Sequence, residues 1–158
     1  MYNLINMKHM KKLLSLFVAI FATTALWAFD FVGDNFLCYN ITSSSEPYTV
    51  QVTCQVSFSS ENYYGISSFT IPTTVEHNGI TYAVTSIDYR AFLNCFALKS
   101  ITIPEGITNI GTIAFENCKA LTSITIPNSV TNIGQSAFGN DSSLTSITIG
   151  KGVINIGY

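Results

Sequence analysis

Charged residues are scarce in this chain of 158 residues: they make up 10% of it, against 47% for hydrophobic residues. With so little charge and so much apolar material, we expect one ordered domain and not a disordered chain. Basic residues are particularly few. Proteins that bind nucleic acids or anionic membranes need clustered Lys and Arg to neutralise phosphates, so the composition argues against both partners.

Long hydrophobic runs are also lacking, apart from one at the N-terminus. Residues 13–27 are apolar, and they follow Lys8, Lys11 and Lys12. The run is shorter than the roughly 20 residues that a membrane-spanning helix needs, and its layout is typical of a secretory signal peptide. We therefore predict a signal peptide over residues 1–28 and no membrane insertion after its removal. The rest of the chain has four basic and nine acidic residues, a net charge of −5.

Histidine and metal-binding cysteine motifs are nearly absent, which leaves few groups for catalysis. His77 is the only histidine after residue 28, and a single histidine beside a turn is usually solvated. Glu105 and Glu116 do not recur along the chain, so no fixed geometry relates them as a catalytic pair. No Cys-x-x-Cys motif or Cys/His cluster indicates zinc. The sequence thus predicts a protein that is not an enzyme and has neither cofactor nor metal.

Cysteine is limited to four residues, which form two candidate pairs. Cys95 and Cys118 are 23 residues apart and are expected to be buried thiols, with a disulfide between them as the alternative. Cys38 and Cys54 face each other in a hairpin centred on Glu46. A register slipped by one residue would instead unite the apolar side chains of the two strands, so the apolar pattern argues against that bond. Both disulfides stay open at this point.

One pattern repeats in this chain at a spacing of 23 residues. Residues 98–120 read LKSITIPEGITNIGTIAFENCKA, residues 121–143 read LTSITIPNSVTNIGQSAFGNDSS, and a third copy from Leu144 is incomplete at Tyr158. An earlier copy carries nine extra residues near 75–81, where Asn-Gly favours a tight hairpin. Such a repeat predicts a solenoid, in which each unit buries its apolar residues against the next copy.

Each position within the repeat has an expected role. The Ile-Thr-Ile alternation predicts a short strand with Ile pointing inward and Thr outward. Gly111, Gly134 and Gly157 mark turns. Ala114-Phe115 and Ala137-Phe138 are expected in a short helical or irregular segment that places a column of Phe in the core. Two further columns are expected to be structural amides at the corners of the coil: Asn94, Asn117 and Asn140, and Asn109, Asn132 and Asn155.

The segment before the repeats predicts a β-hairpin. Residues 48–58 alternate strictly between apolar and polar side chains, with Thr53 on the polar side. They follow another β-rich run, and the turn-forming residues SSSEP lie between the two. We therefore predict a signal peptide at 1–28, an N-terminal β cap at 29–66 and a solenoid at 67–158. The cap would cover the apolar end of the first coil.

These units resemble the BspA-like class of bacterial leucine-rich repeats in their spacing, their Pro, their N-I-G and their A-F. The resemblance covers roughly residues 67–158 and implies a β-rich leucine-rich repeat solenoid with parallel strands. The Asn ladder of commoner leucine-rich repeats is replaced by Gly106, Ser129 and Gly152, so the comparison is restricted to the BspA-like class. This class implies a secreted protein, or one on the bacterial cell surface or outer membrane, that attaches to host extracellular matrix or to other cells.

Hydroxyl side chains recur on the outward strand face and form the candidate partner-binding face. The simple interpretation is β propensity on a solvated strand, and the functional one is a flat surface for a protein or a surface glycan. The candidate residues are Thr70, Ser100, Thr102, Ser123, Thr125, Ser146 and Thr148.

Two other functions stay open. A carbohydrate-binding accessory or hydrolase would need a groove lined with aromatic side chains or paired carboxylates, which the outward repeat positions do not supply. The second possibility is that the protein is a truncated remnant without a partner. Because no cap closes the last copy in the sequence, a longer array and end-to-end self-association are further alternatives.

Overall fold

The structure is a computed structural model that describes residues 29–34, 37–53 and 66–158. The predicted signal peptide lies outside these residues. In the described part the chain forms strands and turns and no helix. The strands are β1 (Phe31–Val32), β2 (Cys38–Ser43), β3 (Thr49–Thr53), β4 (Ser68–Thr70), β5 (Thr74–His77), β6 (Ile80–Ile87), β7 (Ser100–Thr102), β8 (Asn109–Ile110), β9 (Ser123–Ile126), β10 (Asn132–Ile133), β11 (Ser146–Ile149) and β12 (Asn155–Ile156).

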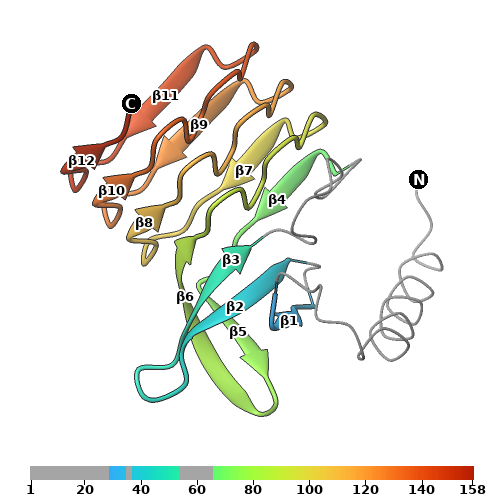
Figure 1. Ribbon diagram of the computed structural model, residues 1–158, viewed down its shortest axis with the longest axis vertical. Coiled ribbons are helices and arrows are strands. Elements are labelled where there is room, and N and C mark those ends of the chain that lie inside the picture. The colour runs from blue at the N-terminus through green and yellow to red at the C-terminus, as the bar shows by residue number, and fades with distance from the viewer. Residues whose placement is uncertain (1–28, 35–36, 54–65) are drawn as a thin grey trace.

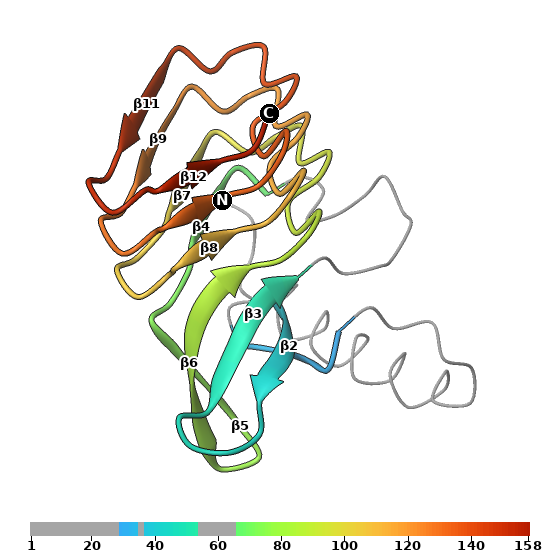
Figure 2. The ribbon, with the colours of Figure 1, turned by 60° about the vertical axis from the view of Figure 1, so that its left-hand side comes forward.

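Neighbouring repeats stack through parallel strands in two ladders. On one side β4 pairs with β7 and β9 pairs with β11, and Figure 1 shows these four strands side by side. In the second ladder β8, β10 and β12 pair in parallel, with Asn132 opposite both Asn109 and Asn155. Figure 2 shows both ladders and the turns that join them into coils. Paired residues are 23 positions apart in β8, β10 and β12 and in β9 and β11, and 32 apart in β4 and β7, where the nine extra residues intervene. The predicted solenoid with parallel strands is therefore confirmed.

The N-terminal hairpin extends the second ladder. β2 and β3 pair antiparallel, β3 lies parallel to β6, and β6 pairs with β8. Tyr39 lies opposite Val52, which is the slipped register that unites the apolar side chains of the hairpin. Cys38 consequently faces Thr53. Cys54, the other half of the candidate disulfide, lies outside the described residues.

A second hairpin occupies the place of the nine extra residues. β5 and β6 pair antiparallel from Thr74–Ala83 to His77–Ile80. Asn78 and Gly79 form the turn with φ angles of 52° and 77°, the left-handed backbone that a two-residue hairpin turn requires. The domain boundaries stay a prediction.

The core runs through the middle of the coils as columns of like residues. Two pairs of equivalent isoleucines are at most 8% exposed. One pair is Ile101 and Ile124, and the other is Ile103 and Ile126. The predicted Phe column is present in turns, not in a helix: Phe92 and Phe115 stack with ring centroids 5.1 Å apart, and Phe115 and Phe138 with centroids 5.3 Å apart. Stacked rings of this kind add to the free energy gained from burying apolar area.

The corners of the coils depend on backbone conformations that few residues tolerate. Two columns have left-handed φ angles of 51° to 63°, which cost about 1–2 kcal/mol for most side chains and less for Asn. Glycine has a different reason at Gly134, where a Cβ would lie 2.4 Å from the amide nitrogen of Thr112 in the preceding coil. The left-handed columns are Arg90, Ile113 and Ser136, and Asn94, Asn117 and Asn140.

Three predictions about polar residues need correction. Thr53 was expected on the solvent side, but it is 2% exposed and its hydroxyl donates to Asp88 Oδ2 over 3.1 Å. His77 ends strand β5 and does not lie in the turn, and its half-buried ring stacks on Phe31 with centroids 4.1 Å apart. The asparagine columns have a structural role, but they join coils by bonds between side chains, as in the 3.1 Å bond from Asn117 Nδ2 to Asn94 Oδ1.

Candidate functional site: the outward strand face

The candidate face is built from the outward positions of the first ladder. Ser68 and Thr70 of β4 lie opposite Ser100 and Thr102 of β7. The same pattern repeats in β9 and β11, where the paired residues are 23 positions apart. All seven residues of the candidate face are exposed: Thr70, Ser100, Thr102, Ser123, Thr125, Ser146 and Thr148. Pairing within each sheet spaces equivalent hydroxyls by about 4.8 Å.

The column next to this face is also mostly uncharged. Ser67, Lys99, Thr122 and Thr145 precede the four strands and are exposed. Thr145 Oγ1 donates to the carbonyl oxygen of Thr122 over 3.2 Å. A hydroxyl can donate one hydrogen bond and accept two, so the surface suits a partner that presents both donors and acceptors. A flat sheet without a cleft can contact an extended partner at several coils at once.

Other hydroxyls of the repeat are used inside the protein. Thr108 Oγ1 donates to the carbonyl oxygen of Thr85 over 3.2 Å, and Thr131 Oγ1 donates to that of Thr108 over 3.1 Å. These bonds join successive coils beside the second ladder. Threonines of this column therefore have a structural role, which sets them apart from Thr102, Thr125 and Thr148.

Side chains at the proline corner bind the backbone of the following coil. The carboxylate of Glu105 accepts the N–H groups of Asn128 and Ser129, over 3.1 and 3.0 Å. These donors hold the pKa of Glu105 below its usual value. In the next coil Asn128 Oδ1 accepts the N–H of Lys151 over 2.9 Å. Glu105 is thus a hydrogen-bond acceptor at the corner of the coil.

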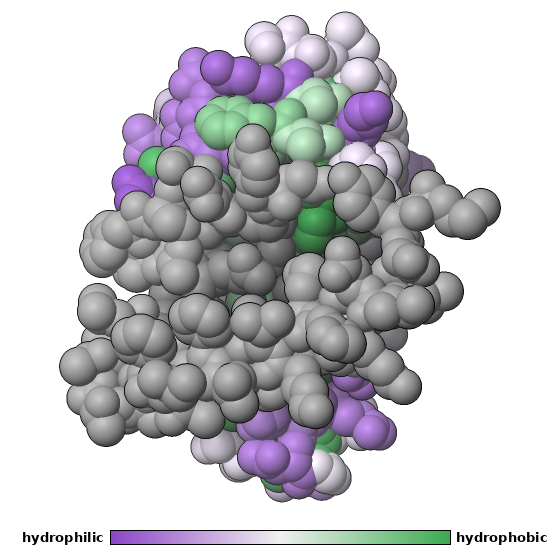
Figure 3. Space-filling view, turned by 90° about the vertical axis from the view of Figure 1, so that its right-hand side faces the viewer, coloured by the Kyte–Doolittle hydropathy of each residue, from purple (hydrophilic) through white to green (hydrophobic). Residues whose placement is uncertain are grey.

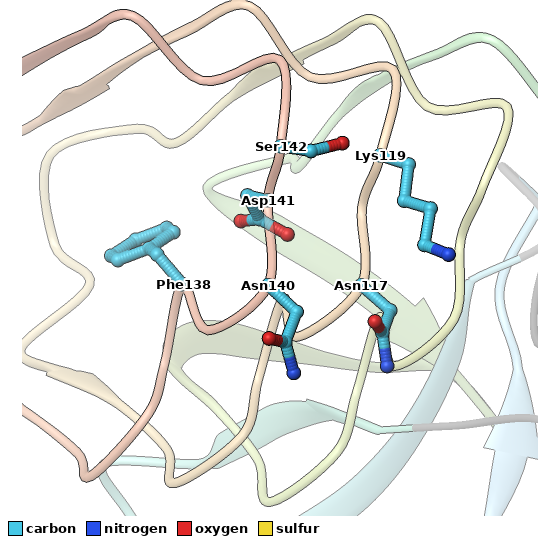
Figure 4. Close-up of a pocket in the computed structure, with 6 residues that line it drawn as sticks. All are labelled: Asn117, Lys119, Phe138, Asn140, Asp141 and Ser142. Carbon is cyan, nitrogen blue, oxygen red and sulfur yellow. The ribbon is translucent and has the colours of Figure 1, made fainter.

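A hollow on the loop side of the coils contains the most perturbed carboxyl group. Figure 4 shows Asn117 and Asn140 projecting side by side from neighbouring coils and Phe138 pointing the other way, toward the coil interior. Asp141 Oδ1 accepts the Cys118 N–H over 2.7 Å, while its Oδ2 is buried without a hydrogen-bond partner among the described residues. Burial raises the pKa of Asp141 to about 6. This face, which Figure 3 shows, is mainly hydrophilic around the last coils, with a hydrophobic patch among them.

The described residues hold no cluster of three or more His, Cys, Asp and Glu that could bind a metal ion. Cys118 is a buried thiol that donates to the carbonyl oxygen of Phe92 over 3.3 Å. Its hydrogen bond with Cys95 and its burial raise the pKa of the Cys118 thiol. Cys95 and Cys118 are therefore both thiols, as expected, and do not form the alternative disulfide. A protonated thiol is a poor nucleophile. Within the described part of the chain, no helix is long and apolar enough to cross a membrane.

The parallel ladders, the 23-residue coils and the central Phe column define a leucine-rich repeat solenoid. The family described as "BspA type Leucine rich repeat region (6 copies)" matches residues 73–158. The chain belongs to this family, so the resemblance seen in its repeats is confirmed.

Solved structures of bacterial leucine-rich repeat proteins are similar to this chain. A leucine rich cell surface protein from Faecalibacterium prausnitzii A2-165 is 28% identical, with a TM-score of 0.62, over 80% of this chain and 32% of that protein. The T. pallidum leucine rich repeat protein TpLRR is 20% identical, with a TM-score of 0.57, and the match covers 81% of this chain and 64% of that protein. The pneumococcal vaccine antigen PcpA is 20% identical, with a TM-score of 0.56, and the match covers 78% of this chain and 38% of that protein.

The last two similarities show the fold alone. The chain spans about a third of the length of the F. prausnitzii protein and less than two thirds of the other two. No curated protein matches the sequence. Proteins of the BspA-like class are generally surface modules for protein interaction and are typically not enzymes.

Proposed function

We propose that this protein is a secreted or surface-displayed adhesion module that binds an extended partner through its outward strand face. The observation that carries the proposal is the repeated exposure of hydroxyl side chains in register on β4, β7, β9 and β11. Each coil would supply a weak contact, and several coils acting together would give useful affinity.

Three features support surface display and the lack of catalysis. The N-terminal run has the layout of a secretory signal peptide. A similar protein from F. prausnitzii is described as a cell surface protein. The carboxylate of Glu105 is bonded to the backbone of the following coil at a corner. Host extracellular matrix and the surfaces of other cells are the partners that we propose.

The test is binding to a panel of immobilised matrix proteins and cell-surface glycans. A variant with Thr102→Glu, Thr125→Glu and Thr148→Glu should lose at least ten-fold in affinity, because charge and bulk would then cover three neighbouring coils. A control with Gln135→Glu and Ser142→Glu adds charge at exposed positions of the loop side and should bind normally. Equal binding by the wild type and the triple variant would contradict the proposal.

A further inference from the structure

Two aromatic side chains are exposed in the turns between β6 and β7. Tyr89 is 48% exposed and Phe96 is 41% exposed. The equivalent positions of the next two coils are polar, with Thr112 and Gln135 in the column of Tyr89 and Lys119 and Ser142 in that of Phe96. The repeat therefore does not require an aromatic side chain at either position. Figure 2 shows these turns on the side of the coils away from β9 and β11.

A positively charged side chain lies over each of the two rings. Arg90 Cζ is 4.7 Å from the centroid of the Tyr89 ring, and Lys119 Nζ is 5.6 Å from that of the Phe96 ring. The chain has only four basic residues after residue 28, so half of them lie against these exposed rings. We call Tyr89, Arg90, Phe96 and Lys119 the aromatic–cation patch.

The two cations of the patch lack an anionic partner in the described part of the chain. Neither forms an ion pair there, and Arg90 Nε is buried without a hydrogen-bond partner. The neighbouring carboxylates bind other groups. Asp88 accepts the Tyr89 N–H over 2.7 Å and the Thr53 hydroxyl over 3.1 Å, and Glu116 Oε1 accepts a side-chain amide over 3.1 Å. A buried donor without an acceptor costs stability, so packing of the coil does not explain Arg90.

The patch offers two kinds of contact to a partner. A guanidinium group can donate two parallel hydrogen bonds to a carboxylate, and an ammonium group can pair with a second one. The exposed rings can pack against apolar side chains. Tyr and Arg are also enriched among the residues that dominate binding at protein interfaces. This combination differs from the outward strand face, which presents hydroxyl groups.

We propose that the aromatic–cation patch binds an acidic segment of a partner protein. Carboxylates of the segment would pair with Arg90 and Lys119, and its apolar side chains would pack on Tyr89 and Phe96. The net charge of −5 after residue 28 disfavours an acidic partner elsewhere on the protein, which adds to the selectivity for this patch. Residues 89 and 96 are at most about 25 Å apart, so an extended segment of about seven residues reaches both rings. The proposal is independent of the outward strand face.

The test measures binding of the full chain to an array of short synthetic peptides that combine Asp or Glu with Leu or Phe. A matched array has Asn and Gln in place of Asp and Glu, and it should bind about ten-fold more weakly. For a peptide that binds, Arg90→Gln and Lys119→Gln should each weaken binding about five-fold, and Tyr89→Ala and Phe96→Ala about ten-fold. Added salt should also weaken binding, because it screens exposed charges. Circular dichroism identifies any variant that fails to fold, and the other variants then decide the result.

Matched controls remove the same kinds of group elsewhere. Lys99→Gln and Lys151→Gln remove the other two basic side chains after residue 28, both exposed, and Tyr158→Ala removes an exposed ring of the last coil. All three variants should bind the peptide like the wild type. An equal loss in these controls would mean nonspecific attraction and would overturn the proposal. Equal binding of the Asn and Gln peptides, tighter binding of heparin than of every acidic peptide, or no binding of either array would overturn it as well.

Discussion

The repeats and the N-terminal cap bury their residues by different means. In the repeats the core side chains meet equivalent residues of the next coil, as Phe115 meets Phe92 and Phe138. In the cap, contacts join unlike residues far apart in the chain, such as Thr53 with Asp88. A position in the repeats can be interpreted from its column, whereas a position in the cap depends on a partner that no periodicity reveals. The predictions below test this difference, from the largest expected effect to the smallest.

The Phe column should be the most sensitive part of the molecule. Phe115 is fully buried between two rings, and Phe115→Ala should lower the free energy of unfolding by about 4 kcal/mol. Phe138 is only partly buried, so Phe138→Ala should cost less. Urea denaturation checks both values. Equal costs would mean that contact with a ring on each side adds nothing.

Glycines of the stacked coils and of the inserted β5–β6 hairpin should respond differently to the same change. Gly134→Ala would place a Cβ 2.4 Å from a backbone nitrogen of the preceding coil and should cost about 3 kcal/mol through overpacking. Gly79→Ala has open space around the Cβ and only the strain of a φ angle of 77°, which is worth about 1 kcal/mol. Thermal and urea unfolding measure the difference. A smaller loss at Gly134 than at Gly79 would contradict the close stacking of coils.

Hydroxyl groups should matter more in the cap than in the repeats. Thr53→Val removes the donor of a partly buried hydrogen bond to the Asp88 carboxylate and should cost about 1–2 kcal/mol. Thr108→Val removes an exposed bond to Thr85 and should cost about 0.5 kcal/mol or less. The two variants have the same change in shape, so the comparison reports the combined effect of greater burial and of a charged acceptor at Thr53. The reverse order of costs would refute this assignment.

Asp141 should make the protein less stable as the pH rises. Its pKa is about 6 in the folded state against an ordinary value of 3.8, so the folded state binds more protons between these values and stability falls with increasing pH. Asp141→Asn keeps the oxygen that accepts the Cys118 N–H, and it should stabilise the protein at pH 7 by about 1 kcal/mol after allowance for solvent screening. At pH 3 the gain should vanish. Urea titrations at both pH values measure it, and a gain at both would exclude the carboxylate as the cause.

Much of the solenoid followed from the sequence because repetition replaces tertiary information. The columns of Ile101 and Phe115 identified the core, and the apolar pattern selected the hairpin register against the pairing of Cys38 with Cys54. The glycine at position 134 was expected at a turn, although its close approach to Thr112 needed the coil spacing.

The remaining features required contacts that periodicity does not encode. Nothing in the sequence links Thr53 to Asp88 or His77 to Phe31, because the partners lie on separate strands. Ile113 has a φ angle of 62°, which a β-branched side chain disfavours. Its sequence therefore did not predict this backbone conformation, which it shares with the equivalent residues Arg90 and Ser136 of the neighbouring coils. The outward face was identified from its sequence, and its partner stays a proposal.

The register of the coils is the basis of every site described, and solution NMR tests it most directly. In the first ladder Thr125 lies opposite Thr148 in parallel strands. Cross-strand nuclear Overhauser effects should therefore connect backbone protons of residues 23 apart along β9 and β11, as well as along β8, β10 and β12. Connections at another offset, or with the strands antiparallel, would contradict the solenoid and remove the common face on which the hydroxyl groups lie.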